Sequence, residues 1–192
     1  GAAAPAFENW RARTHLGLAG AISARVGWPV CLVDYRLAPE HPFPAAIDDL
    51  RAVHAALSER PGGLAVGGDS AGGGLVLALL GDILRRGAIP PRAVFAFSPV
   101  TDLAFETESF RRNRDADVLL PAARAKEMND LYLGTADPAD PLASPIHADF
   151  TGAPPVWLSV GSTEILLDDT RLMAAKLRAQ AVEVEEVIEE DL

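Results

Sequence analysis

Residues 64–77 read LAVGGDSAGGGLVL, and this stretch decides the fold. The apolar residues at 64–67 predict a short β-strand, and the apolar run that begins at Ala71 predicts a helix to about Arg86. Gly68 and Gly72 flank Ser70, where their missing side chains would avoid collisions between strand and helix at a cramped bend. The stretch therefore predicts a strand, a sharp turn and a helix, with the Ser70 hydroxyl pushed into the open.

The rest of the chain alternates short apolar runs with longer helix-compatible segments. This pattern predicts an α/β fold, with a mostly parallel sheet flanked by helices. Further strands are expected at 30–35, 93–98, 156–161 and 181–188, and helices at about 14–26, 45–58, 121–133 and 168–180. The strands at 93–98 and 156–161 are apolar throughout, which is typical of strands covered on both faces.

The segment at 102–155 carries no strand signal. It contains one helix-compatible stretch and several Asp-Pro and Ser-Pro pairs, which favour turns. Connections of this length are typical of lids and binding loops. We therefore expect a single domain over 1–192 with a lid-like insertion at about 102–155.

Composition and charge exclude several classes of protein. The chain has 192 residues, 49% of them hydrophobic, with 27 acidic against 17 basic residues and a net charge of −10, which disfavours nucleic-acid and anionic-membrane partners. No apolar stretch approaches the ~18 residues of a membrane span, and the first residues lack the features of a secretion signal. The single cysteine, Cys31, lies in an apolar run and is expected to be a buried thiol, which fits a cytoplasmic protein.

Ser70 occupies the central position of a G-x-S-x-G pattern between an expected strand and an expected helix. That context identifies a nucleophile elbow, in which the serine hydroxyl stands at a helix N-terminus. The N–H of Ala71 can there donate to an oxyanion as a carbonyl substrate becomes tetrahedral. The alternative is an incidental serine in a glycine-rich turn, which the flanking elements make the weaker interpretation.

Two motifs together resemble a known family. Residues 68–73, GDSAGG, are similar to the elbow of bacterial hormone-sensitive-lipase-like carboxylesterases, and residues 34–45, DYRLAPEHPFPA, are similar to the stretch that precedes that elbow. The resemblance implies an incomplete α/β-hydrolase fold and a serine esterase for small or medium acyl esters, with no cofactor or metal. The 34–45 motif itself favours a structural role, with Arg36 and Glu40 available to pair. A peptidase of the same fold fits the two motifs less well.

A serine nucleophile needs a base and a carboxylate that orients the base, in the chain order Ser, Asp or Glu, His. Residues 164–169, EILLDD, follow the expected strand at 156–161 and resemble the family's D/E-x-L-x-D-D segment, whose first acidic residue orients the histidine. Glu164 is therefore the candidate acid, and Asp168 is the next choice.

The histidine of this order has no candidate in the sequence. All four histidines precede Glu164, at positions 15, 41, 54 and 147. His41, in the loop before the elbow, is a weak alternative. The resemblance places the base roughly thirty residues after the acid, just beyond Leu192, so we expect a chain truncated near its base with little or no esterase activity.

The N-terminal side differs from the family as well. Where the family's HGGG loop would supply further oxyanion donors, the sequence has alanines and Pro5, which lacks an N–H. The family also has a strand between those matching 30–35 and 64–67, so a gap or a re-paired sheet is expected here.

A second hypothesis is a small-ligand-binding protein on an esterase scaffold, like the plant gibberellin receptors, which resemble these esterases but lack the histidine. The esterase hypothesis implies a small-molecule ester as partner. The oligomeric state stays open, a homodimer included.

Overall fold

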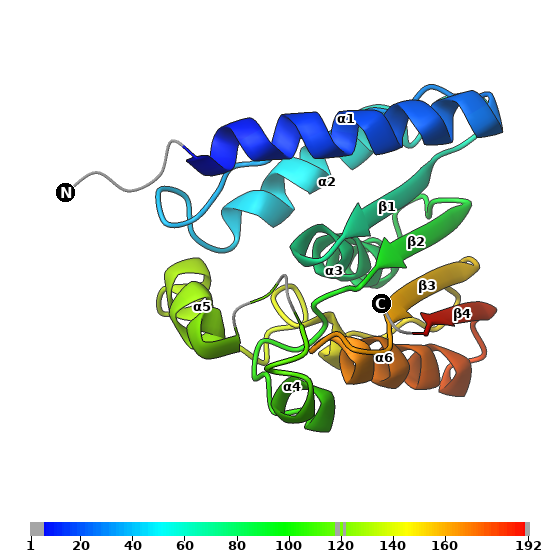
Figure 1. Cartoon of the computed structure of the whole chain (residues 1–192). Coiled ribbons are helices and arrows are strands. Elements are labelled where there is room, and N and C mark those ends of the chain that lie inside the picture. Colours follow the sequence, from blue (N-terminus) through cyan, green and yellow to red (C-terminus); the bar gives the residue numbers. More distant parts are fainter. Residues whose placement is uncertain (1–5, 118–119, 121, 191–192) are drawn as a thin grey trace. The chain divides into compact units, whose positions relative to one another are not determined.

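Four parallel strands form one sheet in the part of the chain that the computed structural model describes, residues 6–117, 120 and 122–190, with side chains from His15 onward. The strand order is β1-β2-β3-β4 (Figure 1). The strands are β1 (Ala65–Asp69), β2 (Ala93–Phe97), β3 (Val156–Gly161) and β4 (Val184–Glu189). Because neighbouring strands run parallel, their carboxyl ends meet at one edge, where Asp69 pairs with Phe97 and Phe97 with Ser159.

All the predicted helices form, but the first begins at Ala6 instead of at about Thr14, and the short helix at 108–112 was not predicted. The helices are α1 (Ala6–Val26), α2 (Ala45–Leu57), α3 (Ala71–Arg85), α4 (Glu108–Arg112), α5 (Ala125–Leu133) and α6 (Leu167–Ala179), with short 3-10 turns η1 (Ala122–Arg124) and η2 (Pro145–His147). The predicted helix at 121–133 corresponds to η1 and α5, and its first residue lies outside the described residues. The α/β fold with a parallel sheet flanked by helices is confirmed.

The core lies between the sheet and the helices α3 and α6. Its fully buried side chains include Leu77 and Leu80 of α3, Met173 and Leu177 of α6, and Leu158 of β3. Residues of a strand alternate between its two faces, so Val94 and Ala96 of β2 point into this core together. Phe150 is also fully buried there, although it belongs to the long connection between β2 and β3.

The opposite face of the sheet carries an aromatic group. Phe97 packs edge-on against Phe95 and Trp157, with ring centroids 5.8 and 5.3 Å apart. All three side chains are half-buried. The prediction of burial on both faces is therefore confirmed for β3, in which five of six residues are buried, but not for β2, in which only alternate residues are buried.

The chain divides into two compact units at Asp34 and Tyr35. In the first unit, α1 is followed by a segment without regular secondary structure, and the predicted strand at 30–35 does not form. A strand is stable only when its backbone groups bond to a neighbouring strand, and none pairs with this segment in the described chain. Val30, Leu32 and Cys31 are exposed there, so the prediction of a buried thiol is wrong.

None of the described helices combines the length and the apolar character that a bilayer crossing requires.

Arg36 pairs with Asp49 of α2 through two of its nitrogens, at 2.8 and 3.0 Å, and not with Glu40 as predicted. Aspartate 49 lies one helical turn after Ala45, so this pair fixes the 34–45 motif to the start of α2, a structural role.

An ion network joins α2 to the far end of α3. Asp82 of α3 is buried, with 1% of its side chain exposed, and accepts hydrogen bonds from Arg51 of α2 at 2.8 Å and from Arg86 at 3.3 Å. Arg85 bonds to the other carboxylate oxygen. Burial alone would raise the pKa of Asp82, but the three arginines outweigh it and lower that pKa to about 2.

We predict that Asp82→Asn lowers the free energy of unfolding by about 3 kcal/mol at pH 7, because it leaves Arg51 without its buried partner. The folded pKa lies below the unfolded value of about 3.9, so this contribution is present above pH ~4 and is lost as the pH falls towards 2. Urea unfolding from pH 7 down to pH 3 measures both effects. Asp48→Asn is the matched control, since Asp48 bonds to the same arginine but is half exposed; an equal loss there would contradict the prediction.

Candidate active site

Ser70 connects β1 to α3 in a strained backbone conformation. Its φ of 57° and ψ of −117° lie in a region that non-glycine residues rarely adopt. Three backbone hydrogen bonds hold it: its N–H donates to the Phe97 carbonyl at 2.8 Å, and its carbonyl accepts from the N–H groups of Gly74 and Val100, each at 3.1 Å. The predicted transition from strand to helix is confirmed, and Ser70 is half-buried, outside the packed core.

The glycines around Ser70 have different functions. A Cβ at Gly68 would collide with the backbone of Gly72, so strand and helix approach closely only without a side chain there. The same prediction for Gly72 is wrong, because a Cβ at Gly72 would meet no described atom within 4 Å. Instead, Gly74 makes room for the carbonyl of Val100, and Gly67 for the ring of Phe95.

The first turn of α3 lies at the edge of the sheet where the strands have their carboxyl ends. At the start of α3, the first N–H that donates to a helical carbonyl is that of Gly74, which bonds to the carbonyl of Ser70. The N–H of Ala71, the first helical residue, therefore has no partner within the helix. Ala71 is exposed, so an oxyanion held beside Ser70 would be within reach of solvent and of this donor.

Glu164 lies after β3 with one carboxylate oxygen fixed. Oε1 accepts a hydrogen bond from the Ser98 hydroxyl at 2.8 Å and another from the Gly161 N–H at 2.7 Å. Ser98 itself follows β2 at a φ of 42°, with its N–H donating to Ser159 at 2.7 Å. The glutamate is half-buried.

Consecutive residues at the end of β2 link the serine to the acid. Phe97 accepts the N–H of Ser70 on one side, and Ser98 donates to Glu164 on the other. Both sequence-predicted residues therefore lie at the carboxyl ends of the strands, the edge at which open α/β sheets bind ligands. Sequence reasoning missed Ser98, because a serine that follows an apolar strand belongs to no recognisable motif.

Asp168 is occupied by a different interaction. Its Oδ2 accepts the Ser109 N–H at 2.7 Å, its own N–H donates to the Ser109 hydroxyl at 3.0 Å, and Arg171 lies 3.9 Å from Oδ1. Ser109 belongs to α4 and is buried. This arrangement joins α4 to α6.

Asp169 is a second residue that sequence reasoning missed. It is buried and accepts hydrogen bonds at Oδ1 from the N–H groups of Thr101 and Asp102 and from the Thr101 hydroxyl. Burial raises the pKa of Asp169 to about 6, against the lowering effect of these donors. It holds the segment after β2 against α6, and its signal in the sequence was only its place in the paired acids at 168–169.

The histidines lie elsewhere in the fold. His41 and His147 are exposed, and His54 is buried on α2. No hydrogen bond among the described residues joins these three histidines to Ser70 or Glu164. His15 lies on α1, in the first unit. No group of three or more metal-binding side chains occurs in the described part of the chain.

Comparison with known proteins identifies relatives of this chain. A family model described as alpha/beta hydrolase fold matches residues 6–192. An acetyl-hydrolase of Streptomyces hygroscopicus is 41% identical over 171 residues, which cover 87% of this chain and 57% of that protein. An esterase of Acinetobacter venetianus is 37% identical over 183 residues, which cover 93% of this chain and 60% of that protein. The chain thus spans less than two thirds of these curated relatives.

Solved structures agree with the sequence comparison. A crystal structure of an esterase from the bacterial hormone-sensitive lipase family matches 83% of this chain and 55% of its own, with a TM-score of 0.78 and 41% identity. An esterase/lipase from an uncultured bacterium matches 93% of this chain and 61% of its own, with a TM-score of 0.85 and 38% identity.

We predict that Gly68→Ala lowers the free energy of unfolding by about 3 kcal/mol, because the new methyl group meets the backbone of Gly72 and cannot be relieved by a rotamer change. Gly72→Ala is the matched control. It has open space for the methyl group and replaces a helical glycine, so it should be neutral or stabilise by up to about 1 kcal/mol. Chemical unfolding of both variants measures the difference, and equal losses would contradict the steric explanation.

Proposed function

The chain belongs to the α/β-hydrolase fold family and resembles its hormone-sensitive-lipase-like esterases, and from this premise we propose that it carries the nucleophile and the acid of a serine carboxylesterase. The observation that carries the proposal is the backbone of Ser70, held at positive φ between β1 and α3 with a half-buried side chain. The substrate class is a small-molecule ester with a small or medium acyl group.

In the proposed reaction the Ser70 hydroxyl oxygen attacks the acyl carbon while a base takes its proton. The N–H of Ala71 donates to the oxyanion that forms, and the base then protonates the departing alkoxide, which leaves as an alcohol. Water then attacks the acyl-serine by the same route, which releases the carboxylic acid product and restores the Ser70 hydroxyl. The strained turn supports this proposal because it keeps the hydroxyl out of the α3 helix and clear of the core.

Glu164 is the acid of the proposal. The bonds from Ser98 and Gly161 both go to Oε1, so they fix the plane of the carboxylate and leave Oε2 to receive an imidazole N–H. In contrast, Asp168 uses one oxygen for Ser109 and turns the other towards Arg171. This difference favours Glu164 over Asp168.

The base of the proposal lies outside the 192 residues. In the order Ser, acid, His, the histidine follows the acid, and His147 is the last histidine of the sequence. The absence of a hydrogen bond from His41, His54 or His147 to Ser70 or Glu164 among the described residues supports this proposal. The chain by itself is therefore proposed to lack effective turnover.

The lid-like role of 102–155 remains part of the proposal in a narrower form. Phe150 is fully buried in the core, and η2 packs against α3, so this end of the connection belongs to the body of the fold. The α5 helix, by contrast, contacts the 34–45 motif: the Phe43 N–H donates to the Tyr132 carbonyl at 2.7 Å, and the two rings pack edge-on. The helix α4 is joined to α6 through Ser109 and Asp168, so we assign the lid to the part around α5.

Added imidazole tests the missing base. We predict that the purified chain shows little Ser70-dependent hydrolysis of a short-chain nitrophenyl ester, and that imidazole raises the Ser70-dependent rate at least about tenfold, because a general base contributes ~10²–10⁴. Ser70→Ala is assayed at each imidazole concentration, and its rate is subtracted to correct for the hydrolysis that imidazole performs in solution.

Each other outcome of this assay is informative. Ser70-dependent turnover without imidazole would show that a base within the chain substitutes, which contradicts the proposed place of the histidine. Equal rates for the chain and Ser70→Ala at every imidazole concentration would contradict the proposed nucleophile and favour a binding protein on the same scaffold.

Replacement of the two acids separates their roles. Glu164→Gln keeps an oxygen for Ser98 and Gly161 but removes the charge, so we predict that the imidazole-dependent rate falls about tenfold while the melting temperature changes little. Asp168→Asn weakens the contact with Ser109 and should cost about 1 kcal/mol of stability while the rate is kept. The reverse pattern would make Asp168 the acid.

A further inference from the structure

The turn that carries the candidate acid begins where β3 ends. The Glu164 N–H donates to the Gly161 carbonyl at 3.2 Å, and the Gly161 N–H donates to Glu164 Oε1 at 2.7 Å. The four residues from Gly161 to Glu164 therefore form a β-turn. The helix α6 that follows adds one long bond, from the Leu167 N–H to the Glu164 carbonyl at 3.3 Å. So short a turn has few bonds of its own, and the place of its carboxylate depends on what holds it.

Asn113, the residue that follows α4, bonds to two carbonyls of this turn. Its Nδ2 donates to the Glu164 carbonyl at 2.8 Å and to the Ser162 carbonyl at 3.3 Å. A primary amide has two N–H groups on one nitrogen, so one side chain can serve both carbonyls. Only 7% of Asn113 is exposed, and its Oδ1 accepts a bond from Arg112 Nε at 3.3 Å. Both ends of the buried amide are therefore paired.

The backbone of Asn113 is fixed too. Its N–H donates to the Ser109 carbonyl at 2.8 Å, and its carbonyl accepts from the N–H groups of Ala116 and Asp117 at 2.9 and 2.8 Å. Asn113 thus ends α4 and begins the next turn with its backbone bonded on both sides. A side chain carried on such a backbone loses little further freedom when it bonds, so it can anchor a neighbouring segment effectively.

The peptide group that follows Glu164 is held at both of its polar atoms. Asn113 bonds to its oxygen, and its N–H, which belongs to Ile165, donates to Asp117 Oδ2 at 3.0 Å. A peptide group is planar, so contacts at its oxygen and its nitrogen fix its orientation. The next carbonyl, that of Ile165, accepts from the Ser109 hydroxyl at 2.9 Å. Of these three side chains, only Asn113 bonds to the backbone of Glu164 itself.

We propose that Asn113 is a positioning residue of the candidate acid, an inference that rests on the proposed function. It acts through the backbone of Glu164, while Ser98 and Gly161 act on the carboxylate. A catalytic carboxylate has to lie within hydrogen-bond reach of the imidazole that it orients, at ~2.6–3.2 Å. Because Oε1 is already bonded, a displaced turn would either break those bonds or turn Oε2 away from the base. The bonds from Asn113 prevent that displacement.

The test uses the Gly161 N–H, which bonds to the Glu164 carboxylate and so reports where that carboxylate lies. Glu164→Ala removes the acceptor and sets the limit of the effect. In ¹H–¹⁵N spectra of the whole chain we expect Asn113→Ala to shift the Gly161 signal at least about half as far, because hydrogen bonds weaken steeply with misalignment. Asn113→Asp keeps the volume, loses both N–H donors and should shift the signal in the same direction. An unmoved Gly161 signal in either variant, when folded, would overturn the inference.

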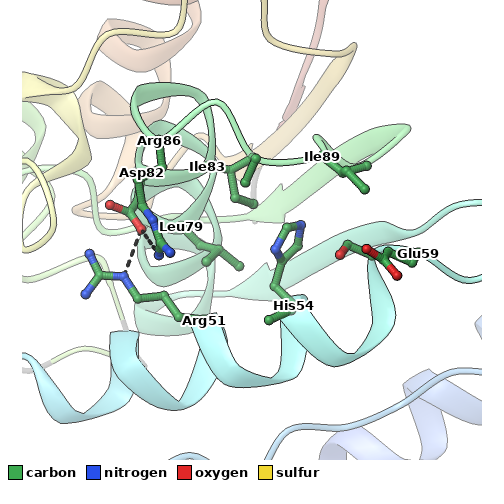
Figure 2. Close-up of a pocket in the computed structure, with 11 residues that line it drawn as sticks. Arg51, His54, Glu59, Leu79, Asp82, Ile83, Arg86 and Ile89 are labelled. Carbon is green, nitrogen blue, oxygen red and sulfur yellow. Dashed lines mark hydrogen bonds and ion pairs between the residues drawn. The ribbon is translucent and has the colours of Figure 1, made fainter.

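Asp82→Asn is the matched control for a general loss of stability. It breaks the ion network at the far end of α3, where the dashed lines in Figure 2 mark the bonds of Asp82 to Arg51 and Arg86. A chemical shift is measured in the folded state, so a loss of stability alone should leave the Gly161 signal in place. A shift in Asp82→Asn as large as that in Asn113→Ala would contradict a positioning role.

A measurement on the unchanged chain needs no variant. Both Nδ2 hydrogens of Asn113 should exchange slowly with solvent, because they are buried and bonded to carbonyls. Rapid exchange of these hydrogens would overturn the inference even if neither variant of Asn113 folds.

The imidazole assay separates this inference from the proposed function. Asn113→Ala should lower the maximal Ser70-dependent rate about fivefold and leave the KM for the ester unchanged, because Asn113 acts through the acid and not on the ester. A raised KM with an unchanged maximal rate would contradict the positioning role. A chain without any Ser70-dependent hydrolysis would contradict the proposed function, while the Gly161 signal would still decide whether Asn113 positions Glu164.

Discussion

The hydrogen bond from the Ser70 N–H to the Phe97 carbonyl is the contact on which the arrangement of this site depends. It continues the β1–β2 ladder by one residue past the last paired position, at the point where the chain must leave the sheet. The Ser70 carbonyl then starts α3 through Gly74 and receives the N–H of Val100 from beyond β2. A backbone at positive φ costs ~1–3 kcal/mol, and it persists here because three bonds from two separate segments define it.

The same edge of the sheet is organised by carboxylates that act on backbone N–H groups. Glu164 accepts from Gly161, Asp168 from Ser109, and Asp169 from Thr101 and Asp102. The bonds of Asp168 and Asp169, together with the bond from the Ser98 hydroxyl to Glu164, cross-link the segments that follow β2 and β3, which have no ladder of their own to hold them. Asp169, with its raised pKa, is the most buried of the three and accepts the most hydrogen bonds. A buried carboxylate with this many donors fixes the positions of the segments that donate to it. The candidate acid thus lies within a framework of fixed loops.

Local patterns predicted the parts of this fold that depend on neighbours in sequence. The elbow at 68–72, the helix at 45–58 and the strand at 156–161 all form close to their predicted places. The prediction of a strand at 30–35 was wrong because a strand needs a partner, and the sequence of the segment itself does not determine with which strand it pairs. Gly72 was assigned a packing role that belongs to Gly74, since only the fold brings the Val100 carbonyl against the helix. The role of Ser98 could not be predicted either, because its partner, Glu164, is distant in sequence and only the fold brings the two together.

The burial of helix α3 explains how the turn at Ser70 is kept in a fixed position. Its residues from Gly73 to Ile83 are all buried, so the helix packs on several sides and has no free face along which to slide. At its far end Asp82 ties it to Arg51 of α2, and at its near end Gly74 lets it approach the Val100 carbonyl. The Ser70 carbonyl is bonded to the first turn of this buried helix through Gly74, so the backbone of the turn is tied to the core. Rigid elements of this kind position a reactive group more accurately than loops do, and here the strain of the turn is balanced by burial along the helix that follows it.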